Sequence, residues 1–157
     1  MTNALPQGAP VTPFKIGIAG YGKMGASMVL SWQKAGLIKT IDIYDPFCAE
    51  DSVLKIEDAF LEKAATWDVL VLAIKPQTLN SFLDGKEGAL PRELPILSIL
   101  AGKTTKDLSK KFREQNPLVR AMPNTPAAIG MGMSVAVENP TLNPSQRQMV
   151  ESLLLAM

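Results

Sequence analysis

The 157 residues of this chain are enough to bury one hydrophobic core, and a second complete domain does not fit beside it. Apolar residues make up 46% of the chain, which supplies such a core, and Lys and Arg (16) nearly balance Asp and Glu (15). The charges form no basic run, so the sequence lacks the electrostatic footprint of a nucleic-acid binder. We expect small molecules or other protein chains as partners.

The start of the chain and its cysteine content indicate the domain boundary and the cellular compartment to expect. Residues 1–13 contain three prolines and a glycine, so we expect a disordered lead-in there and a single domain over residues 14–157. No signal peptide is indicated, and no stretch approaches the ~20 apolar residues that span a bilayer, so we expect no membrane contact. Cys48 is the only cysteine, which excludes an internal disulfide and favours a cytoplasmic protein.

A glycine-rich turn follows the first predicted strand. The apolar run at 15–19 ends in Gly20-x-Gly22-x-x-Gly25, and apolar residues at helical spacing follow. The first glycine permits a sharp turn, the second leaves room for a phosphate and the third lets the helix lie close to the strand. The helix start favours an anion. We therefore expect a dinucleotide pyrophosphate here, bound by Gly20, Tyr21, Gly22, Lys23, Met24 and Gly25.

An acidic residue follows the second predicted strand at the spacing that a dinucleotide site requires. The strand at 40–44 ends in Asp45-Pro46, and Asp45 stands 20 positions after Gly25. A carboxylate at this place hydrogen-bonds the adenosine ribose. Asp45 can also be read as a turn former before Pro46, and the sequence leaves both readings open.

The remaining elements alternate between strands and helices. In chain order they are a short edge strand at 52–56, a helix at 57–65, a strand at 68–74, a helix at 77–83, a strand at 95–100, a helix after Thr104, strands at 118–122 and 133–137, and a helix after Asn143. The last two helices show capping patterns, Thr104 with Asp107 and Asn143 with Gln146. This order predicts an α/β fold, a Rossmann-like and mostly parallel sheet with helices on both faces. The last helix carries its apolar stripe to Met157 without a stop signal, so we expect a longer protein.

Three further loops should reach the carboxyl edge of that sheet, where ligands bind. Lys75, within Ala73-Ile74-Lys75-Pro76, is read either as a partner for ribose or phosphate oxygens or as a solvated surface lysine. Ala101-Gly102 provides either a flat surface for a ring or simply a strand end. Two prolines stiffen the loop of Met122, Pro123, Asn124 and Thr125, which suits a small substrate or a carboxamide.

These segments form one combination. They read Gly20-x-Gly22-x-Met24-Gly25, Ala73-Ile74-Lys75-Pro76, Ser98-x-x-Ala101-Gly102 and Arg120-x-Met122-Pro123-Asn124-Thr125-Pro126, with Gly130-x-Gly132 after them. Over residues 15–157 the chain resembles the pyrroline-5-carboxylate reductases. The resemblance implies hydride transfer from NAD(P)H to 1-pyrroline-5-carboxylate in proline synthesis. It also implies a helical, dimer-forming C-terminal domain that is missing here, so the full-length protein is expected to be a homo-oligomer and this fragment to be inactive.

Two points of the resemblance bear on the chemistry. Many family members have a small or hydroxyl residue where this chain has Asp45, and a carboxylate repels a 2′-phosphate, so we expect NADH to be preferred over NADPH. The chain has no histidine, and no catalytic residue or metal ligand is assigned within it, because the proton donor can lie on the missing domain.

Two other interpretations remain. A dehydrogenase of the 3-hydroxyacid or 6-phosphogluconate type shares the glycine loop and has a helical partner domain. A non-enzymatic module that senses a dinucleotide needs no substrate loop, and the segment from Met122 to Pro126 argues against it.

Overall fold

The computed structural model describes residues 12–47, 59–123, 135–138 and 141–157. Several expectations lie outside these ranges: the lead-in over 1–11, the edge strand at 52–56, and the residues Asn124 and Thr125. Within the described part of the chain, no helix combines the length and the apolar character that a membrane crossing needs.

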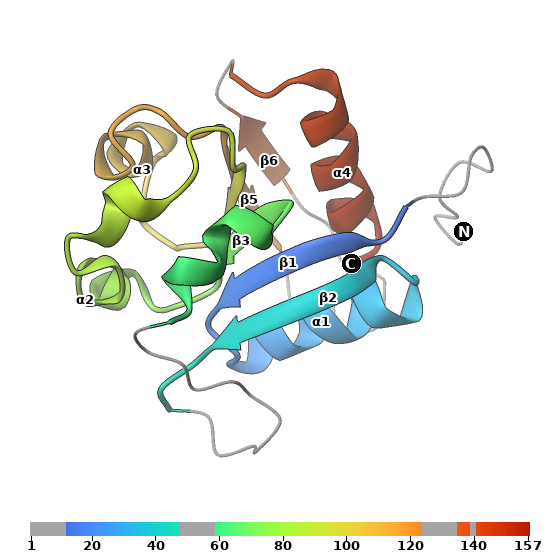
Figure 1. The fold of residues 1–157 in the computed structure, drawn as a ribbon. Helices are drawn as coiled ribbons and strands as arrows, with labels where there is room; N and C mark the ends of the chain where they lie inside the picture. The colour runs from blue at the N-terminus through green and yellow to red at the C-terminus, as the bar shows by residue number, and fades with distance from the viewer. Residues whose placement is uncertain (1–11, 48–58, 124–134, 139–140) are drawn as a thin grey trace.

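One twisted sheet of six described strands organises the molecule (Figure 1). From one edge to the other the order is β2-β1-β3-β4-β5-β6. The first five run parallel and β6 runs antiparallel to β5, which confirms the mostly parallel sheet expected from the sequence. The strands are β1 (Phe14–Ala19), β2 (Ile38–Tyr44), β3 (Val69–Leu72), β4 (Ile96–Ser98), β5 (Leu118–Met122) and β6 (Val135–Glu138).

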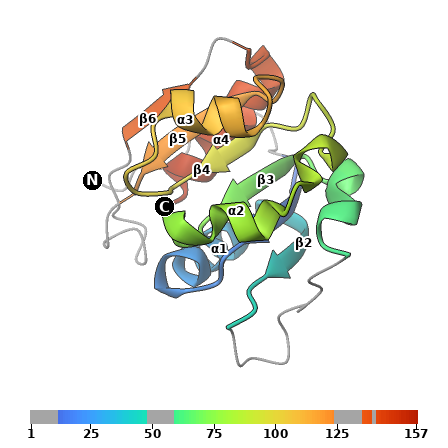
Figure 2. The same ribbon diagram turned by 90° about the vertical axis from the view of Figure 1, so that its left-hand side faces the viewer.

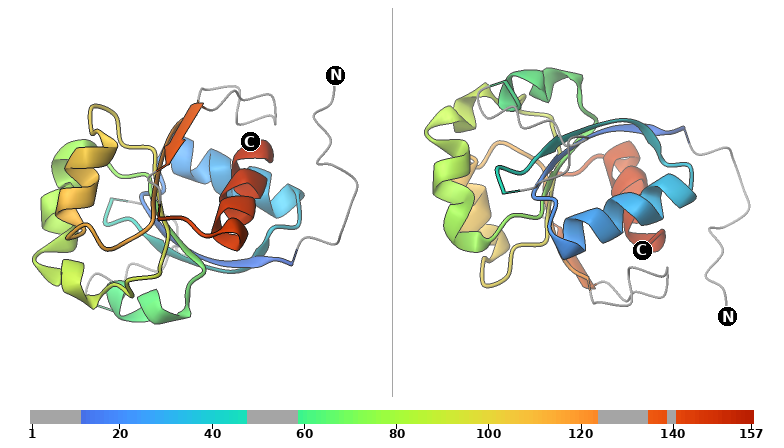
Figure 3. Two further views of the ribbon diagram at one scale, coloured as in Figure 1. Left: turned by 90° about the horizontal axis from the view of Figure 1, so that it is seen from above. Right: turned by 90° about the horizontal axis from the view of Figure 1, so that it is seen from below.

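Helices cover both faces of the sheet, as the views along it show (Figures 2 and 3). Val69 and Val71 of β3 pack under α1 (Lys23–Lys34) and α4 (Pro144–Leu155) on one face. Leu70 and Leu72 point to the other face. That face is covered by η1 (Leu61–Thr66), α2 (Leu79–Leu83) and α3 (Thr105–Lys111), and by Leu90 directly after η3 (Lys86–Ala89). Because β3 is buried on both sides, its apolar run shows no alternation, as expected for a central parallel strand.

The helix starts agree with the capping patterns read from the sequence. Thr104 accepts from the Asp107 N–H, and Asn143 accepts from the Gln146 N–H, each within a reciprocal capping box. Two predicted helices differ in form. The described part of 57–65 is the 3-10 helix η1, and 77–83 begins as the 3-10 helix η2 (Pro76–Thr78) before α2. Propensity alone does not distinguish such short 3-10 turns from α-helix.

A polar clamp holds η1 against the edge strand β2. The Asp42 carboxylate accepts from Lys63 Nζ at 2.7 Å and from Trp67 Nε1 at 2.8 Å. Partial burial by itself would raise the pKa of Asp42, but the hydrogen bonds from Lys63 and Trp67 hold it below its ordinary value. The indole ring lies on Gly17, where an added Cβ would come within 2.5 Å of it. Strand β1 therefore needs a glycine at this point so that Trp67 can pack.

Candidate functional site

The register of the parallel strands aligns their carboxyl ends in one row. Tyr44 pairs with Ala19, Ala19 with Leu72 and Leu72 with Ser98. The chain leaves β1 for β2 on one side and later reaches β3 on the other, so a topological switch point lies between β1 and β3. Ligands of open α/β sheets bind in the crevice outside such a point.

A hollow of about 400 Å³ opens at this switch point. Its lining comes from the tips of β1, β2 and β3 and from the helical segment after β3. The residues are Gly20, Tyr21, Gly22, Tyr44, Asp45, Pro46, Phe47, Ala73, Ile74, Lys75, Thr78, Ser81 and Phe82. A volume of this order accommodates part of a dinucleotide, with the rest lying along the sheet edge.

The three glycines of the turn differ in their surroundings. Gly20 has a φ of +101°, and a Cβ there would collide with the backbone of Ala73. A Cβ at Gly25 would collide with the carbonyl oxygen of Gly20, so this glycine lets α1 approach the end of β1. A Cβ at Gly22 would meet no atom within 4 Å. Gly20 and Gly25 are therefore required by packing, whereas Gly22 borders open space.

The amino terminus of α1 is the electropositive side of this hollow. Gly22 is the N-cap, no side chain caps the helix, and its first turn contains no acidic residue. The first helical hydrogen bond runs from the Ala26 N–H to the Gly22 carbonyl at 2.9 Å. The amides before it project from the helix start, where a diphosphate would find donors and the positive end of the helix dipole.

Asp45 connects the tip of β2 to the glycine turn. One carboxylate oxygen accepts from the Tyr21 N–H at 2.7 Å, and the other accepts from the Phe47 N–H at 2.9 Å. The second contact is the local turn that the Asp-Pro pair suggested, so the two readings of Asp45 are compatible. Each carboxylate oxygen keeps further acceptor capacity, which a ribose hydroxyl in the hollow can use.

The hollow contains only part of the set expected from the sequence. Gly20, Tyr21, Gly22, Asp45, Ala73, Ile74 and Lys75 line it. Lys23, Met24, Gly25, Pro76, Ala101 and Gly102 do not. The last two are exposed and follow β4 along the same edge, and Met122 and Pro123 follow at the end of β5. The residues thus form a row from β2 to β5, with the hollow at its β2 end.

Sequence reasoning missed the aromatic floor of the hollow. The rings of Tyr44 and Phe82 lie 5.0 Å apart, and both contact Phe60. Tyr44 ends an apolar strand and Phe82 lies on a short helix, so each looked like an ordinary core residue. The two rings meet only because α2 packs beside the end of β2 in the folded chain, and no pattern of adjacent residues predicts that contact.

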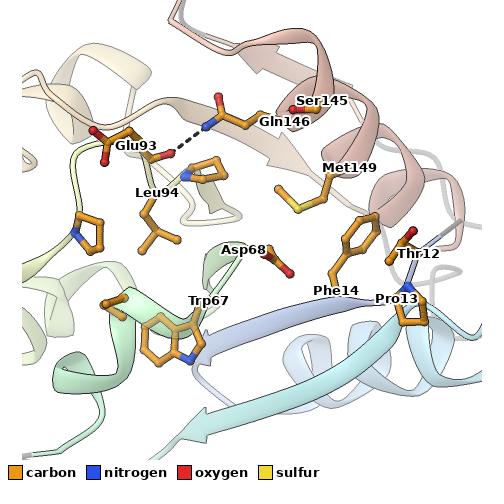
Figure 4. A pocket seen from close by; sticks show the side chains of 14 residues that line it. Thr12, Pro13, Phe14, Trp67, Asp68, Glu93, Leu94, Ser145, Gln146 and Met149 are labelled. Atoms are coloured by element: carbon orange, nitrogen blue, oxygen red, sulfur yellow. Dashed lines mark hydrogen bonds between the residues drawn. The ribbon is translucent and has the colours of Figure 1, made fainter.

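A second hollow, of about 470 Å³, lies at the opposite, amino-terminal edge of the sheet (Figure 4). Phe14, Leu94 and Met149 contribute apolar walls. Two of its polar side chains already have partners: the Gln146 side chain donates to the Glu93 carbonyl at 2.7 Å, and Asp68 accepts from the Lys15 N–H at 2.7 Å. In the described ranges, no group of three His, Cys, Asp or Glu residues could hold a metal ion. The carboxyl-edge hollow is therefore the better candidate for chemistry.

Comparison with known proteins agrees with the fold and with the motifs. A family model described as NADP oxidoreductase, coenzyme F420-dependent, matches residues 15–102, more than half of the chain. The pyrroline-5-carboxylate reductase of Synechocystis is 31% identical over 150 residues, which covers 90% of this chain and 55% of that protein. The chain spans about half the length of the curated relatives it matches.

Solved structures give the same result. The Plasmodium falciparum pyrroline carboxylate reductase, solved with NADP bound, superposes with a TM-score of 0.79 and 26% identity, over 91% of this chain and 55% of that one. The Mycobacterium tuberculosis 3-hydroxyisobutyrate dehydrogenase superposes with a TM-score of 0.70 at 14% identity, over 93% of this chain and 52% of that one, which is a likeness of fold alone. The chain therefore belongs to the family described as NADP oxidoreductase, coenzyme F420-dependent, and it corresponds to the N-terminal domain of the pyrroline-5-carboxylate reductases.

Proposed function

We propose that this chain binds NAD(P)H along the carboxyl edge of its sheet and forms the cofactor-binding part of a pyrroline-5-carboxylate reductase. The observation that carries the proposal is the open face of Gly22 at the uncapped start of α1, inside the hollow that Asp45 borders. When bound, the cofactor supplies the hydride that reduces the imine carbon of 1-pyrroline-5-carboxylate to give proline.

Each part of the site suits one part of the cofactor. The amides of the glycine turn and of the first turn of α1 would hold the diphosphate. Asp45 would accept from the adenosine ribose, and Lys75, exposed at the lip of the hollow, would face phosphate or ribose oxygens. The nicotinamide half would extend past Ala101 and Gly102 toward Met122 and Pro123. Ala101 and Gly102 have small or no side chains and are exposed, which supports a place for a flat ring on this path.

The substrate side of the reaction needs more than the described residues. Asn124 and Thr125 follow directly after Pro123 in the sequence, and we propose that they border the reacting pair. The chain has no histidine, so the imine nitrogen is protonated either before binding or by a group on the C-terminal domain that the relatives imply. We propose that this domain also makes the complete, cytoplasmic enzyme a homo-oligomer.

The first prediction concerns Gly22. Gly22→Ala is expected to weaken NADH binding at least tenfold, because the new Cβ occupies the space through which the diphosphate reaches backbone amides. The free energy of unfolding should change by less than about 1 kcal/mol, because the φ of −72° suits alanine and the space is open. Isothermal titration calorimetry and urea unfolding measure the two effects.

A matched control is Gly36→Ala at the far end of α1, where an added Cβ also meets no neighbour. This variant should bind NADH like the wild type. Unaltered NADH binding by Gly22→Ala would contradict the placement of the diphosphate, and absence of NADH binding by the wild-type chain would overturn the proposed function.

The second prediction concerns the choice of coenzyme. The Asp45 carboxylate borders the hollow and would repel a 2′-phosphate on the bound ribose, so NADH should bind about tenfold more tightly than NADPH, equivalent to about 1.4 kcal/mol. Asp45→Asn should narrow that ratio because it removes the charge. Glu151→Gln removes a charge from the exposed side of α4 and should leave the ratio unchanged. Equal or tighter binding of NADPH by the wild type would refute the preference.

Turnover separates the proposed reaction from its alternatives. A chain that joins this sequence to the helical domain should oxidise NADH in the presence of 1-pyrroline-5-carboxylate and should not reduce NAD with a 3-hydroxyacid. A dinucleotide sensor would catalyse neither of these two reactions. The 157 residues alone are expected to bind cofactor without turnover.

A further inference from the structure

Phe47 is an aromatic residue whose side chain is largely exposed. Its side chain is 87% exposed, more than any other large apolar side chain in the described residues. Phe47 nevertheless belongs to the lining of the carboxyl-edge hollow, next to Asp45 and Pro46. When a ligand covers an aromatic ring that is otherwise exposed to water, burial of the apolar surface stabilises the complex.

The backbone under Phe47 is held in place. Pro46 fixes its own φ, and the Phe47 N–H donates to Asp45 at 2.9 Å. The other carboxylate oxygen of Asp45 is bound to the Tyr21 N–H of the glycine turn. The ring therefore projects from a short turn that is braced against the diphosphate-binding loop.

The chemistry of the neighbouring groups identifies the ligand part that would cover the ring. The proposed function brings a ribose to Asp45, and the base joined to that ribose must lie within a few ångströms of it. On the inner side, the hollow already has the rings of Tyr44 and Phe82 as its floor. Among the described residues that line the hollow, Phe47 follows Asp45 by two positions and offers a planar, apolar ring that is largely exposed.

We propose that Phe47 stacks on the adenine of the bound dinucleotide and closes the outer side of the hollow. This inference rests on the proposed function and adds a residue that determines adenine affinity. A base can stack on any aromatic side chain, but it cannot stack on an aliphatic one. Replacing Phe47 by another aromatic residue should therefore preserve adenine affinity, whereas replacing it by alanine should weaken it.

Calorimetry with NADH and with ADP tests the proposal. Phe47→Ala should weaken both ligands by the same factor, about five- to hundredfold, because both carry adenine. Phe47→Tyr should retain wild-type affinity. The matched control is Leu155→Ala, which truncates an exposed apolar side chain elsewhere, on α4, and should bind both ligands like the wild type. Thermal melting of Phe47→Ala should match the wild type, since an exposed ring contributes little to packing.

A spectroscopic readout reports the stacking directly. In Phe47→Trp the new indole should be exposed, and saturation with ADP should quench its emission and shift it to shorter wavelength. NADH and ADP binding that persist unchanged in Phe47→Ala would overturn the inference and leave the proposed function intact, as would indole emission that does not respond to saturating ADP. A wild-type chain that binds neither ligand would overturn both.

Discussion

Gly20→Ala is expected to lower the free energy of unfolding by about 3–5 kcal/mol, the largest effect of any single methyl group added to the glycine turn. Two penalties combine. The φ of +101° is one that side-chain-bearing residues rarely adopt, at a cost of about 1–3 kcal/mol. The new Cβ would also collide with the carbonyl of Ala73 and lie 2.6 Å from the amide nitrogen of Ile74.

The collision at Gly20 cannot be relieved by a side-chain movement, because both contacts are backbone atoms. Ala73 N–H donates to the Ala19 carbonyl at 2.7 Å, and Gly20 N–H donates to the Tyr44 carbonyl at 2.7 Å. Moving Gly20 therefore separates β1 from both of its neighbours at the carboxyl edge. The hollow should open at the same time, so NADH binding should be lost together with stability.

Urea unfolding of two glycine variants separates the two penalties. Gly36 has a φ of +69° and open space around it, so Gly36→Ala carries the conformational cost without the collision and should lose about 1 kcal/mol. A loss in Gly20→Ala no greater than that in Gly36→Ala would mean that the turn adjusts freely and that the close approach of β1 and β3 is unimportant. Gly22→Ala completes the series, since it should affect binding with little effect on folding.

The contrast between these glycines shows what the sequence can predict about the site. The spacing Gly20-x-Gly22-x-x-Gly25 after a strand predicted the sharp turn at Gly20 and the close helix approach at Gly25, because each depends on a few adjacent residues, and the phosphate role of Gly22 stays a prediction. The strand at 68–74 and the caps at Thr104 and Asn143 were predictable for the same reason: burial of β3 leaves an unbroken apolar run, and a cap is complete within four residues.

Features that depend on distant pairs were not predictable. Tyr44 and Phe82 meet only because the helix after β3 folds back over the tip of β2. The contact from Asp45 to the Tyr21 N–H spans 24 positions. Phe47 carried no signal, because a phenylalanine after Asp-Pro looks like the start of another apolar segment and its exposure appears only in the folded chain. Local patterns thus predict the part of the site where we propose that the diphosphate binds, and tertiary structure determines the part where we propose that the adenosine lies.

Trp32→Phe is expected to lower the free energy of unfolding by about 2–3 kcal/mol, although the substitution keeps an aromatic ring in the core. The sequence predicts only that apolar residues follow the glycine turn at helical spacing, and Trp32 among them is completely buried. Its indole N–H also donates to the carbonyl of Leu153 in α4 at 2.8 Å. This bond joins the two helices that cover one face of the sheet.

The Leu153 carbonyl depends on this donor because it lies in the last turn of α4, where carbonyls lack helical partners. Ser152 and Leu154 accept from the Ala156 and Met157 N–H groups, at 3.2 and 3.3 Å, and Leu153 accepts from Trp32. Phenylalanine would leave that buried oxygen unsatisfied and a cavity beside it, whereas loss of the whole ring in Trp32→Ala would cost about 3–5 kcal/mol.

Trp67→Phe is the matched control, because it removes the same kind of donor from a different acceptor. Trp67 Nε1 donates to Asp42, whose carboxylate is partly exposed and keeps its bond to Lys63 at 2.7 Å. That variant should lose about 1 kcal/mol, since water and Lys63 still satisfy the acceptor. Urea unfolding measures the loss of unfolding free energy in both variants, provided that their m-values equal that of the wild type. Equal losses would show that the Leu153 carbonyl finds another partner and that α1 and α4 are held together by apolar packing alone.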